Sequence, residues 1–266
     1  MDGIANKNDM VKKLDVEKAL LADKGPNAAL LSFEVKDFTK IGDQHASYIT
    51  GVGVQYKTDD KLETANYVVK LNHNPPGLWR QVLNLIFDTE ITFFSEILPL
   101  LNENLAAVNE LPLRAPRCLH FVRTIDQQAL YFDDLRPVGF KLHPRQNTMD
   151  KAHINLILTE LARLHSASVL LMKSDKNFFN KYSKLDANYK SLMTSHLKDS
   201  SLGFFSKGLE GVAKTIDQVP NYEYVAEFLK KKVTTVNDEI FELMQTKEPF
   251  LTLSHGDCWN SNMMFR

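Results

Sequence analysis

Three polar residues near the end of the 266-residue sequence have the types and spacing of a phosphoryl-transfer loop. His255, Asp257 and Asn262 follow the pattern H-x-D-x-x-x-x-N, which is typical of such loops. Asp257 can accept the proton of a substrate hydroxyl, and Asn262 can present its amide oxygen to a magnesium ion on the phosphates. His255 is expected to fix the loop by packing and hydrogen bonding. We therefore assign His255 and Asp257 to catalysis and Asn262 to the metal.

Two charged residues upstream fit the same chemistry in the order that it requires. Lys70 lies near the end of the apolar run at residues 67–71, where a lysine can bridge the α- and β-phosphates to a glutamate on a helix. Glu90, on the next predicted helix, can face back to Lys70. Plainer interpretations exist: a solvated strand end for Lys70, a solvated helix face for Glu90, and a surface loop for the C-terminal triplet. The shared order along the chain favours a nucleotide site.

A turn at residues 41–47 lies where a phosphate-covering loop belongs. Its backbone amides and the Ser47 hydroxyl can donate hydrogen bonds to phosphate oxygens. The turn lacks the pattern G-x-G-x-x-G, so it is a weak nucleotide signal. Gly51 and Gly53 lie inside a strand pattern and indicate close backbone packing.

These residues need a sheet and a helix to position them, and the apolar pattern of the first half supplies both. The pattern predicts a helix at residues 9–21, ended by Gly25 and Pro26, and another at residues 83–98, with Pro99 near its end. Strand-like runs bounded by turn residues lie at residues 30–38, 46–56, 65–71, 118–124 and 129–135. Asp59 and Asp60 mark the turn between the second and third of these runs.

The second half of the chain is almost entirely helical in character from residue 150 onward. Its clearest predicted helices cover residues 153–171 and 224–243. A boundary near residues 136–139 therefore separates a sheet-rich front from a helix-rich back. We predict an α+β fold with one lobe at residues 1–135 and a helical lobe at residues 136–266.

Composition narrows the class of protein. With 44% hydrophobic and 24% charged residues the chain is typical of globular proteins. A net charge of -1 leaves no basic excess to hold a nucleic-acid backbone. Two cysteines are too few for a disulfide scaffold and favour a reduced setting. No signal peptide or membrane-spanning run is predicted, so we expect a cytoplasmic monomer that binds neither nucleic acid nor membranes.

Several segments together resemble one known family. The run LSHGDCWNSNMMF (residues 253–265) closely resembles the catalytic loop of ecdysteroid-kinase-like proteins, the CHK-kinase-like branch related to choline kinases and aminoglycoside phosphotransferases. The resemblance extends to other runs, namely IGDQHASYI, YVVKL, FDTEITFFSEILP, LYFDDLRPVGFK and LARLHSAS. These segments span nearly the whole chain from about residue 30, which makes the resemblance more specific than any single motif.

The resemblance implies a two-lobed protein-kinase-like fold with ATP and magnesium in the cleft. It places the hinge at residues 132–135, with the Asp133 carbonyl and the Leu135 amide at the adenine edge and Phe132 near the gatekeeper position. The resemblance therefore adds Asp133 and Leu135 to Lys70, Glu90 and Ser47 as nucleotide-binding residues. His165 is expected to be structural.

The acceptor implied by the resemblance is a small-molecule hydroxyl, either on an ecdysteroid-like steroid or on a foreign alcohol or phenol. More than a hundred residues separate the hinge from the catalytic loop and can wall a pocket for a bulky, largely apolar acceptor. Aromatic side chains are candidate liners, although core packing explains them equally well: Phe178, Phe179, Tyr182, Phe204 and Phe205.

The sequence departs from the family's pattern at its end. The family has a second acid, an aspartate soon after the Met-Phe of the loop, which holds the magnesium that bridges the phosphates. This sequence stops at Arg266. Because one electrostatic element contributes roughly 10²- to 10³-fold to a rate, we expect the chain as written to transfer phosphate very slowly or not at all. The alternative interpretation is a non-catalytic nucleotide-binding fragment.

Overall fold

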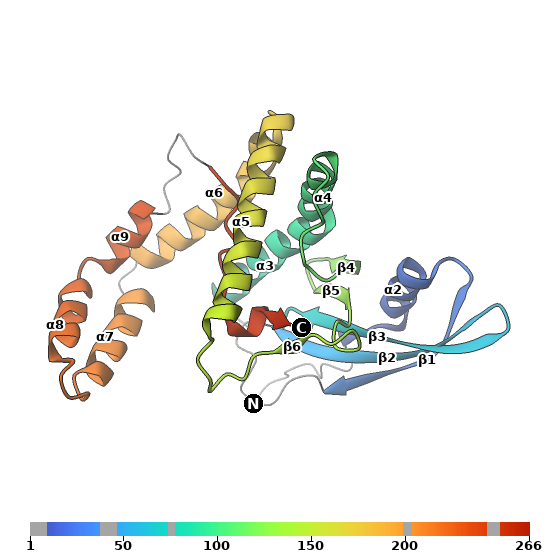
Figure 1. The fold of residues 1–266 in the computed structure, drawn as a ribbon, viewed down its shortest axis with the longest axis horizontal. Coiled ribbons are helices and arrows are strands. Elements are labelled where there is room, and N and C mark those ends of the chain that lie inside the picture. Colours follow the sequence, from blue (N-terminus) through green and yellow to red (C-terminus); the bar gives the residue numbers. More distant parts are fainter. Residues whose placement is uncertain (1–9, 38–46, 74–77, 199–203, 244–250) are drawn as a thin grey trace. The chain divides into compact units, whose positions relative to one another are not determined.

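The computed structural model describes residues 10–37, 47–73, 78–198, 204–243 and 251–266 (Figure 1). Contacts within the chain divide it into two compact units. The first consists of Met1–Lys176 and Thr252–Arg266, and the second is Asn177–Leu251. The C-terminal segment with the candidate catalytic loop thus belongs to the same unit as the sheet. The predicted lobe boundary after residue 135 stays a prediction.

Five antiparallel strands form one sheet in the order β1-β2-β3-β5-β4. The strands are β1 (Ala28–Asp37), β2 (Tyr48–Thr58), β3 (Lys61–Leu71), β4 (Cys118–Arg123) and β5 (Gln128–Asp133). They match the five predicted runs to within a few residues at each end. The predicted turn between the second and third strands is confirmed at Asp59, which has a φ of 51°. Aspartate tolerates this left-handed conformation better than most residues do.

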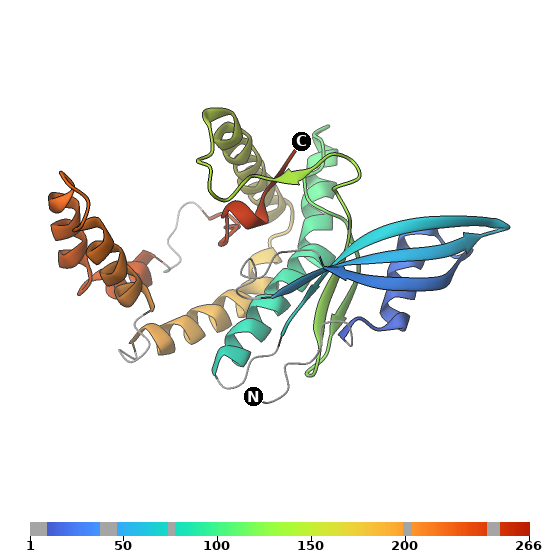
Figure 2. The same cartoon turned by 90° about the horizontal axis from the view of Figure 1, so that it is seen from below.

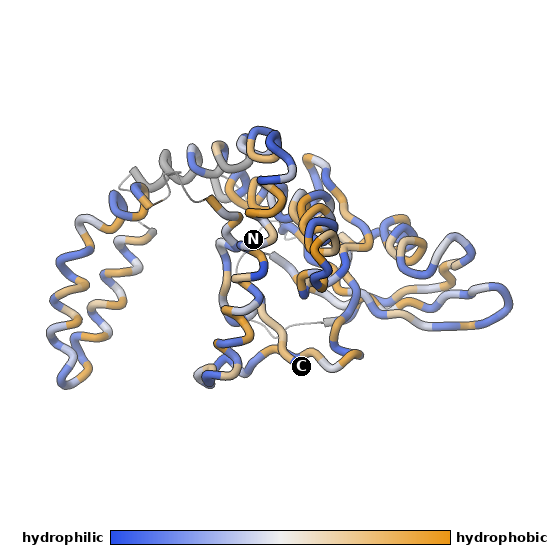
Figure 3. Tube along the Cα trace, turned by 45° about the horizontal axis from the view of Figure 1, so that its top comes forward, coloured by the Kyte–Doolittle hydropathy of each residue, from blue (hydrophilic) through white to orange (hydrophobic). Residues whose placement is uncertain are grey.

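Strands β1, β2 and β3 extend together beyond β5 and β4, because β1 pairs with β2 as far as Thr58 whereas β5 pairs only with Tyr67–Leu71 of β3 (Figure 2). The tip of the β2–β3 hairpin is hydrophilic (Figure 3) and carries Lys57 and Asp60, which form an ion pair of 3.0 Å.

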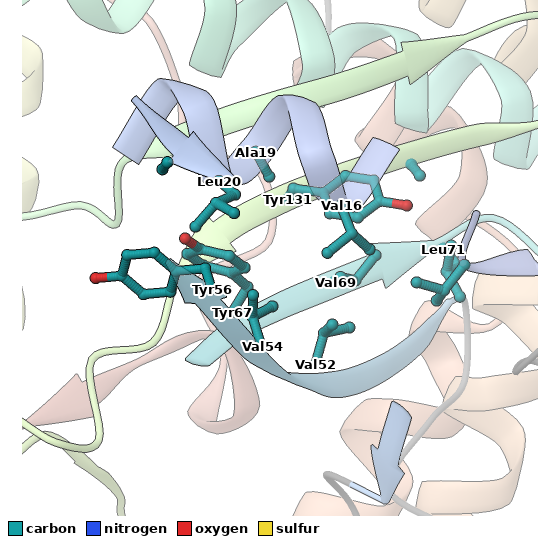
Figure 4. Packing of buried hydrophobic residues seen from close by; sticks show 13 residues of the cluster. Val16, Ala19, Leu20, Val52, Val54, Tyr56, Tyr67, Val69, Leu71 and Tyr131 are labelled. Atoms are coloured by element: carbon teal, nitrogen blue, oxygen red, sulfur yellow. The ribbon is translucent and has the colours of Figure 1, made fainter. Parts of the chain in front are cut away.

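Helix α2 (Lys13–Lys24) packs its apolar side on one face of the sheet (Figure 4). Gly25 ends this helix as predicted, with a φ of 91° and its amide bonded to the Leu21 carbonyl. Glycine suits this position because it lacks a Cβ that would clash at positive φ. The core between the helix and the sheet is formed by fully or nearly fully buried side chains, including Val16, Ala19, Leu20, Val52, Val54, Tyr56, Tyr67, Val69, Leu71 and Tyr131.

Helix α3 (Leu78–Thr92) packs on the opposite face of the sheet. Side chains alternate along a strand, so successive residues of β5 contact different helices. Leu130 and Phe132 of β5 pack with Ile91 of this helix, whereas Ala129 and Tyr131 lie in the α2 core. The sheet therefore separates two helices, one on each face.

The predicted helix end near Pro99 is wrong. Helix α3 runs without a break into a π-helical turn, η1 (Phe93–Ile97), and then into α4 (Leu98–Ala107). Pro99 lies in the first turn of α4, where its missing amide hydrogen costs little. The wider turn, in which the Leu98 amide bonds to the Phe93 carbonyl, lets the helical path continue past the proline.

Helix α5 (Lys151–Ser174) begins at Asp150, whose side chain accepts a hydrogen bond from the His153 amide. By length and composition it is apolar enough to cross a membrane, contrary to the expectation that no run is. A core helix of a soluble protein meets the same criterion. In this unit α5 packs against α4, and Ser174 donates a 2.8 Å hydrogen bond to the Asn104 side chain. The absence of membrane contact stays a prediction.

The second unit, described by itself, contains helices α6 (Phe178–Lys198), α7 (Phe204–Ile216), α8 (Glu223–Lys232) and α9 (Val236–Leu243). The prediction of a single helix at residues 224–243 is therefore wrong. Helices α8 and α9 are separated at residues 233–235, within a run of β-branched residues, which lower helix propensity. Glu239 accepts hydrogen bonds from Lys232 and Thr235, both of 2.7 Å, and these hold the turn between α8 and α9. The proposed acceptor-lining role of the aromatic residues stays a prediction.

Candidate nucleotide-binding and catalytic site

Lys70 and Glu90 form a two-pronged ion pair. The Lys70 ammonium donates to both carboxylate oxygens of Glu90, at 2.8 and 2.7 Å, and each side chain is 23% exposed. Lys70 lies opposite the α2 face, because its neighbours Val69 and Leu71 point into the α2 core. The expected meeting of the strand lysine with the helix glutamate is thus present. Their role as nucleotide ligands stays a prediction.

A network of buried amides holds α3 in the position that this pair needs. The Asn72 side chain, which is fully buried, donates to Asn84 on α3 at 2.9 Å and to Gln128 on β5 at 2.8 Å. Gln128 in turn donates to the Asp88 side chain at 2.9 Å. Because Asp88 and Glu90 share this helix, the network fixes the helix relative to β3. Sequence reasoning missed it, although a polar residue at the end of a buried strand was a visible signal.

The candidate catalytic loop is held by bonds within itself. Gly256 has a φ of 75°, which turns the chain so that the Asp257 amide donates to Nδ1 of His255 at 3.3 Å. The Asn262 side-chain amide donates to the Asp257 carboxylate at 2.7 Å and to the Asp257 carbonyl at 3.0 Å. The structure thus brings together all three residues of the motif, and His255 contributes a hydrogen bond to the loop. Their catalytic roles stay predictions.

The loop is fastened to the helix behind it by a serine that sequence reasoning missed. The Ser168 hydroxyl, fully buried on α5, accepts a 3.1 Å hydrogen bond from the Leu253 amide and donates to the His165 carbonyl at 2.7 Å. Ser168 interrupts the buried apolar stripe that contains Leu164 and Leu171. A polar residue within such a stripe was the available signal.

A two-stranded ladder fastens the other end of the loop. Strand β7 (Met264–Phe265) pairs with β6 (Lys141–Leu142), which follows the hinge. The side-chain amide of Asn260 donates to the His143 carbonyl at 3.3 Å. A two-residue ladder gives no periodic signal in a sequence, so it was not predicted. It joins the catalytic segment to the segment after the hinge.

The predicted hinge residues at the end of β5 take part in ion pairs and in a backbone hydrogen bond. Asp133 accepts hydrogen bonds from the backbone amide and Nε of Arg117, at 2.8 and 3.2 Å. Burial opposes the ionisation of Asp134, but hydrogen bonds from Arg136 outweigh it and hold the pKa of Asp134 below its ordinary value. The Leu135 carbonyl accepts from the Phe140 amide at 3.2 Å. Contact of Asp133 and Leu135 with adenine stays a prediction.

The predicted phosphate loop lies mostly outside the described residues, which resume at Ser47 just before β2. Ser47 is half-buried, and its phosphate-binding role stays a prediction. A Cβ added at Gly53 would lie 3.1 Å from Nζ of Lys36 on β1. The sequence had suggested that another backbone packs closely against Gly53. The close neighbour is instead the Lys36 side chain.

The expected magnesium site can be tested only by its donor types. No cluster of three or more His, Cys, Asp or Glu side chains able to hold a metal occurs in the described ranges. Asp257 and Asn262 supply carboxylate and amide oxygens, which magnesium prefers and normally supplements with water and substrate phosphates. The residue types present therefore fit magnesium.

Comparison with known proteins identifies the family. The model of the ecdysteroid kinase-like family matches residues 41–266. The chain belongs to the ecdysteroid kinase-like family. No curated protein and no solved structure matches it. As a member of this family the chain has a kinase-like α+β fold of two lobes, which its five-stranded antiparallel sheet and helices fit.

The family match begins after the first two described elements of this ecdysteroid kinase-like chain. Helix α2 and strand β1 precede residue 41. Both nevertheless belong to the core of the first unit, since Val16, Ala19 and Leu20 are fully buried against the sheet. The core of the first unit therefore includes residues that the family match does not cover.

Proposed function

We propose that this chain is an ATP-dependent phosphotransferase that phosphorylates the hydroxyl of a small molecule, an ecdysteroid-like steroid or a foreign alcohol or phenol. The observation that carries the proposal is the contact between Asp257 and Asn262. The Asn262 amide binds one carboxylate oxygen of Asp257 at 2.7 Å. The other carboxylate oxygen and the Asn262 amide oxygen receive no hydrogen bond from the described residues. Both are acceptors in an exposed loop.

The proposed chemistry follows from these groups. Asp257 accepts the proton of the acceptor hydroxyl while the hydroxyl oxygen bonds to the γ-phosphorus of ATP and ADP leaves. Lys70, held by Glu90, donates to phosphate oxygens of the nucleotide. Asn262 would hold magnesium through its amide oxygen, and magnesium neutralises phosphate charge when bound.

A direct assay tests the proposal. The 266-residue chain, and the chain extended by whatever residues follow Arg266 in its transcript, are incubated with γ-labelled ATP, magnesium and a panel of hydroxylated steroids, alcohols and phenols. Asp257→Ala is expected to lower the rate by roughly 10²- to 10⁴-fold, the usual contribution of a general base. Asp60→Asn, at the fully exposed hairpin tip, is the matched control and should leave the rate unchanged.

The outcomes separate the candidate functions. Labelled acceptor that depends on Asp257 supports the phosphotransferase. Equal rates for Asp257→Ala and the unaltered chain would remove Asp257 from the proposed role. Binding of ATP with no labelled acceptor in any arm would favour a nucleotide-binding protein without turnover.

A further inference from the structure

The C-terminal end of α2 carries a carboxylate that needs partners. Asp23 lies in the last turn of the helix, where the helix dipole disfavours negative charge. Its side chain is only 9% exposed. Three donors surround it: Nη2 of Arg117 at 2.6 Å, Nζ of Lys24 at 3.1 Å and the hydroxyl of Tyr67 at 3.2 Å. These contacts keep a nearly buried carboxylate ionised at an unfavourable end of the helix.

The pKa shifts have the direction that this geometry requires. Burial opposes the ionisation of Asp23, but the hydrogen bonds from Arg117 and Lys24 outweigh it and hold the pKa of Asp23 below its ordinary value. The hydrogen bond to Asp23 is the main cause that raises the pKa of Arg117. Burial, and then the charge of Asp23, raise the pKa of the Tyr67 hydroxyl.

The same arginine also holds Asp133 at the end of β5. Three hydrogen bonds join residues 117 and 133: Arg117 N to Oδ1 at 2.8 Å, Arg117 Nε to Oδ2 at 3.2 Å, and the Asp133 amide to the Arg117 carbonyl at 3.2 Å. One planar guanidinium thus contacts two carboxylates, Asp23 through Nη2 and Asp133 through Nε. Because the guanidinium is rigid, it fixes the two carboxylates relative to each other, which a lysine ammonium cannot do in the same way.

We propose that Arg117 is a positioning residue that couples α2 to the nucleotide-binding hinge by holding Asp133 in place. The inference rests on the proposed function, which puts Asp133 at the adenine edge. Residues 10–37, including Asp23, lie before the family match. Helix α2 therefore takes part in nucleotide recognition in addition to covering the sheet.

Arg117 itself is 61% exposed, but the Asp23 carboxylate that it holds is only 9% exposed, so removing the Arg117 side chain also lowers stability. Its effect on the orientation of Asp133 is therefore measured by ligand binding and not by unfolding. Loss of the Arg117 side chain would then weaken binding of the adenine end of a nucleotide, whereas binding of the phosphate end, at Lys70, would not change. This difference separates a positioning role from a merely structural one.

A second side-chain contact that holds α2 provides a matched control. Asp15, in the first turn of α2, contacts Nε2 of His120 on β4 at 3.1 Å. This pair joins α2 to β4, whereas Asp23 bonds to Arg117 directly before β4, and no hydrogen bond among the described residues links Asp15 or His120 to Asp133. Asp15→Asn therefore weakens the docking of α2 without altering the hinge contact.

The test is calorimetric titration of ADP and of inorganic tripolyphosphate, each with magnesium, into the unaltered chain and its variants. Arg117→Ala should raise the dissociation constant for ADP on the order of tenfold, since about 1.4 kcal/mol of lost contact corresponds to tenfold in affinity. Its affinity for tripolyphosphate should stay the same, although its thermal midpoint should fall because the nearly buried Asp23 carboxylate loses a donor. The dissociation constant of Arg117→Lys for ADP should lie between those of the unaltered chain and Arg117→Ala. Asp15→Asn should bind ADP as the unaltered chain does.

Three results would overturn the inference. The first is unchanged ADP affinity in Arg117→Ala. The second is equal loss of ADP and tripolyphosphate affinity, which would indicate general destabilisation. The third is an equal loss in Asp15→Asn, which would assign the effect to the docking of α2. Binding of neither compound by the unaltered chain would instead remove the proposed function itself, and the inference with it.

Discussion

Nζ of Lys70 lies 2.8 Å from one carboxylate oxygen of Glu90 and 2.7 Å from the other, although the two residues come from a strand and from the helix that follows it. The pair is half-buried, and the ring of Phe87, one helical turn before Glu90, lies 5.7 Å from the ammonium. An ammonium held in this way has few other positions available. Under the proposed function, such an ammonium is preorganised to receive a phosphate oxygen.

Replacing either member of this pair tests that conclusion. Lys70→Met should lower kcat/KM by roughly 10²- to 10³-fold, the usual effect of losing one preorganised electrostatic contact. Glu90→Gln should lower it less, because glutamine keeps one acceptor for the ammonium. Steady-state kinetics at several ATP concentrations measure both effects. The control is Lys57→Met, an exposed lysine of the same sheet, and an equal loss in that variant would contradict a specific role for Lys70.

Asn262 should control the magnesium requirement. Asn262→Ala removes both the amide oxygen proposed for the metal and the 2.7 Å hydrogen bond to Asp257. We expect the magnesium concentration for half-maximal rate to rise by about tenfold or more, because one oxygen ligand and its orienting bond are lost together. Rates measured against magnesium concentration, with the exposed Asn180→Ala as control, decide the point. An unchanged magnesium dependence would argue that Asn262 only braces the loop.

Asp23 should make the lobe less stable in acid. Because the folded-state pKa of Asp23 is lowered, its contribution is present above the unfolded pKa of about 3.9 and is lost as pH falls through the lower folded value. The free energy of unfolding should therefore differ between the unaltered chain and Asp23→Asn at pH 6, and this difference should shrink below about pH 4. Denaturant titrations at several pH values measure it. A difference that is independent of pH would mean that the carboxylate is not stabilised by its partners.

Tyr131 and Tyr56 offer a pair of opposite predictions. The buried Tyr131 hydroxyl has no hydrogen-bond partner among the residues that the structure describes, whereas the Tyr56 hydroxyl donates to Glu63 at 2.7 Å. Tyr131→Phe should raise the free energy of unfolding by about 1 kcal/mol, because it removes an unsatisfied buried group. Tyr56→Phe should lower it by about 1 kcal/mol. Denaturant unfolding measures both, and a loss of stability in Tyr131→Phe would show that its hydroxyl has a partner such as water.

The sequence by itself determined the features that depend on neighbouring residues. Alternation along residues 67–71 put Val69 and Leu71 on one face of the sheet and Lys70 on the other, because the side-chain period of a strand is two. The spacing from His255 to Asn262 lies within one loop, so the motif could be recognised without knowledge of the fold. Gly25 and Asp59 marked a helix end and a turn through their backbone preferences.

The tertiary structure decided which distant residues meet. Arg117 and Asp23 are 94 residues apart, Leu253 and Ser168 are 85 apart, and the Asn72 and Gln128 side chains are 56 apart. Such contacts leave no periodic pattern, since they depend on strand register and on how each helix packs. The π-helical turn before Pro99 and the β6–β7 ladder arise in the same way. The motif of the loop was therefore visible in the sequence, whereas the contacts that hold the loop, the helix and the predicted hinge in place appeared only in the folded chain.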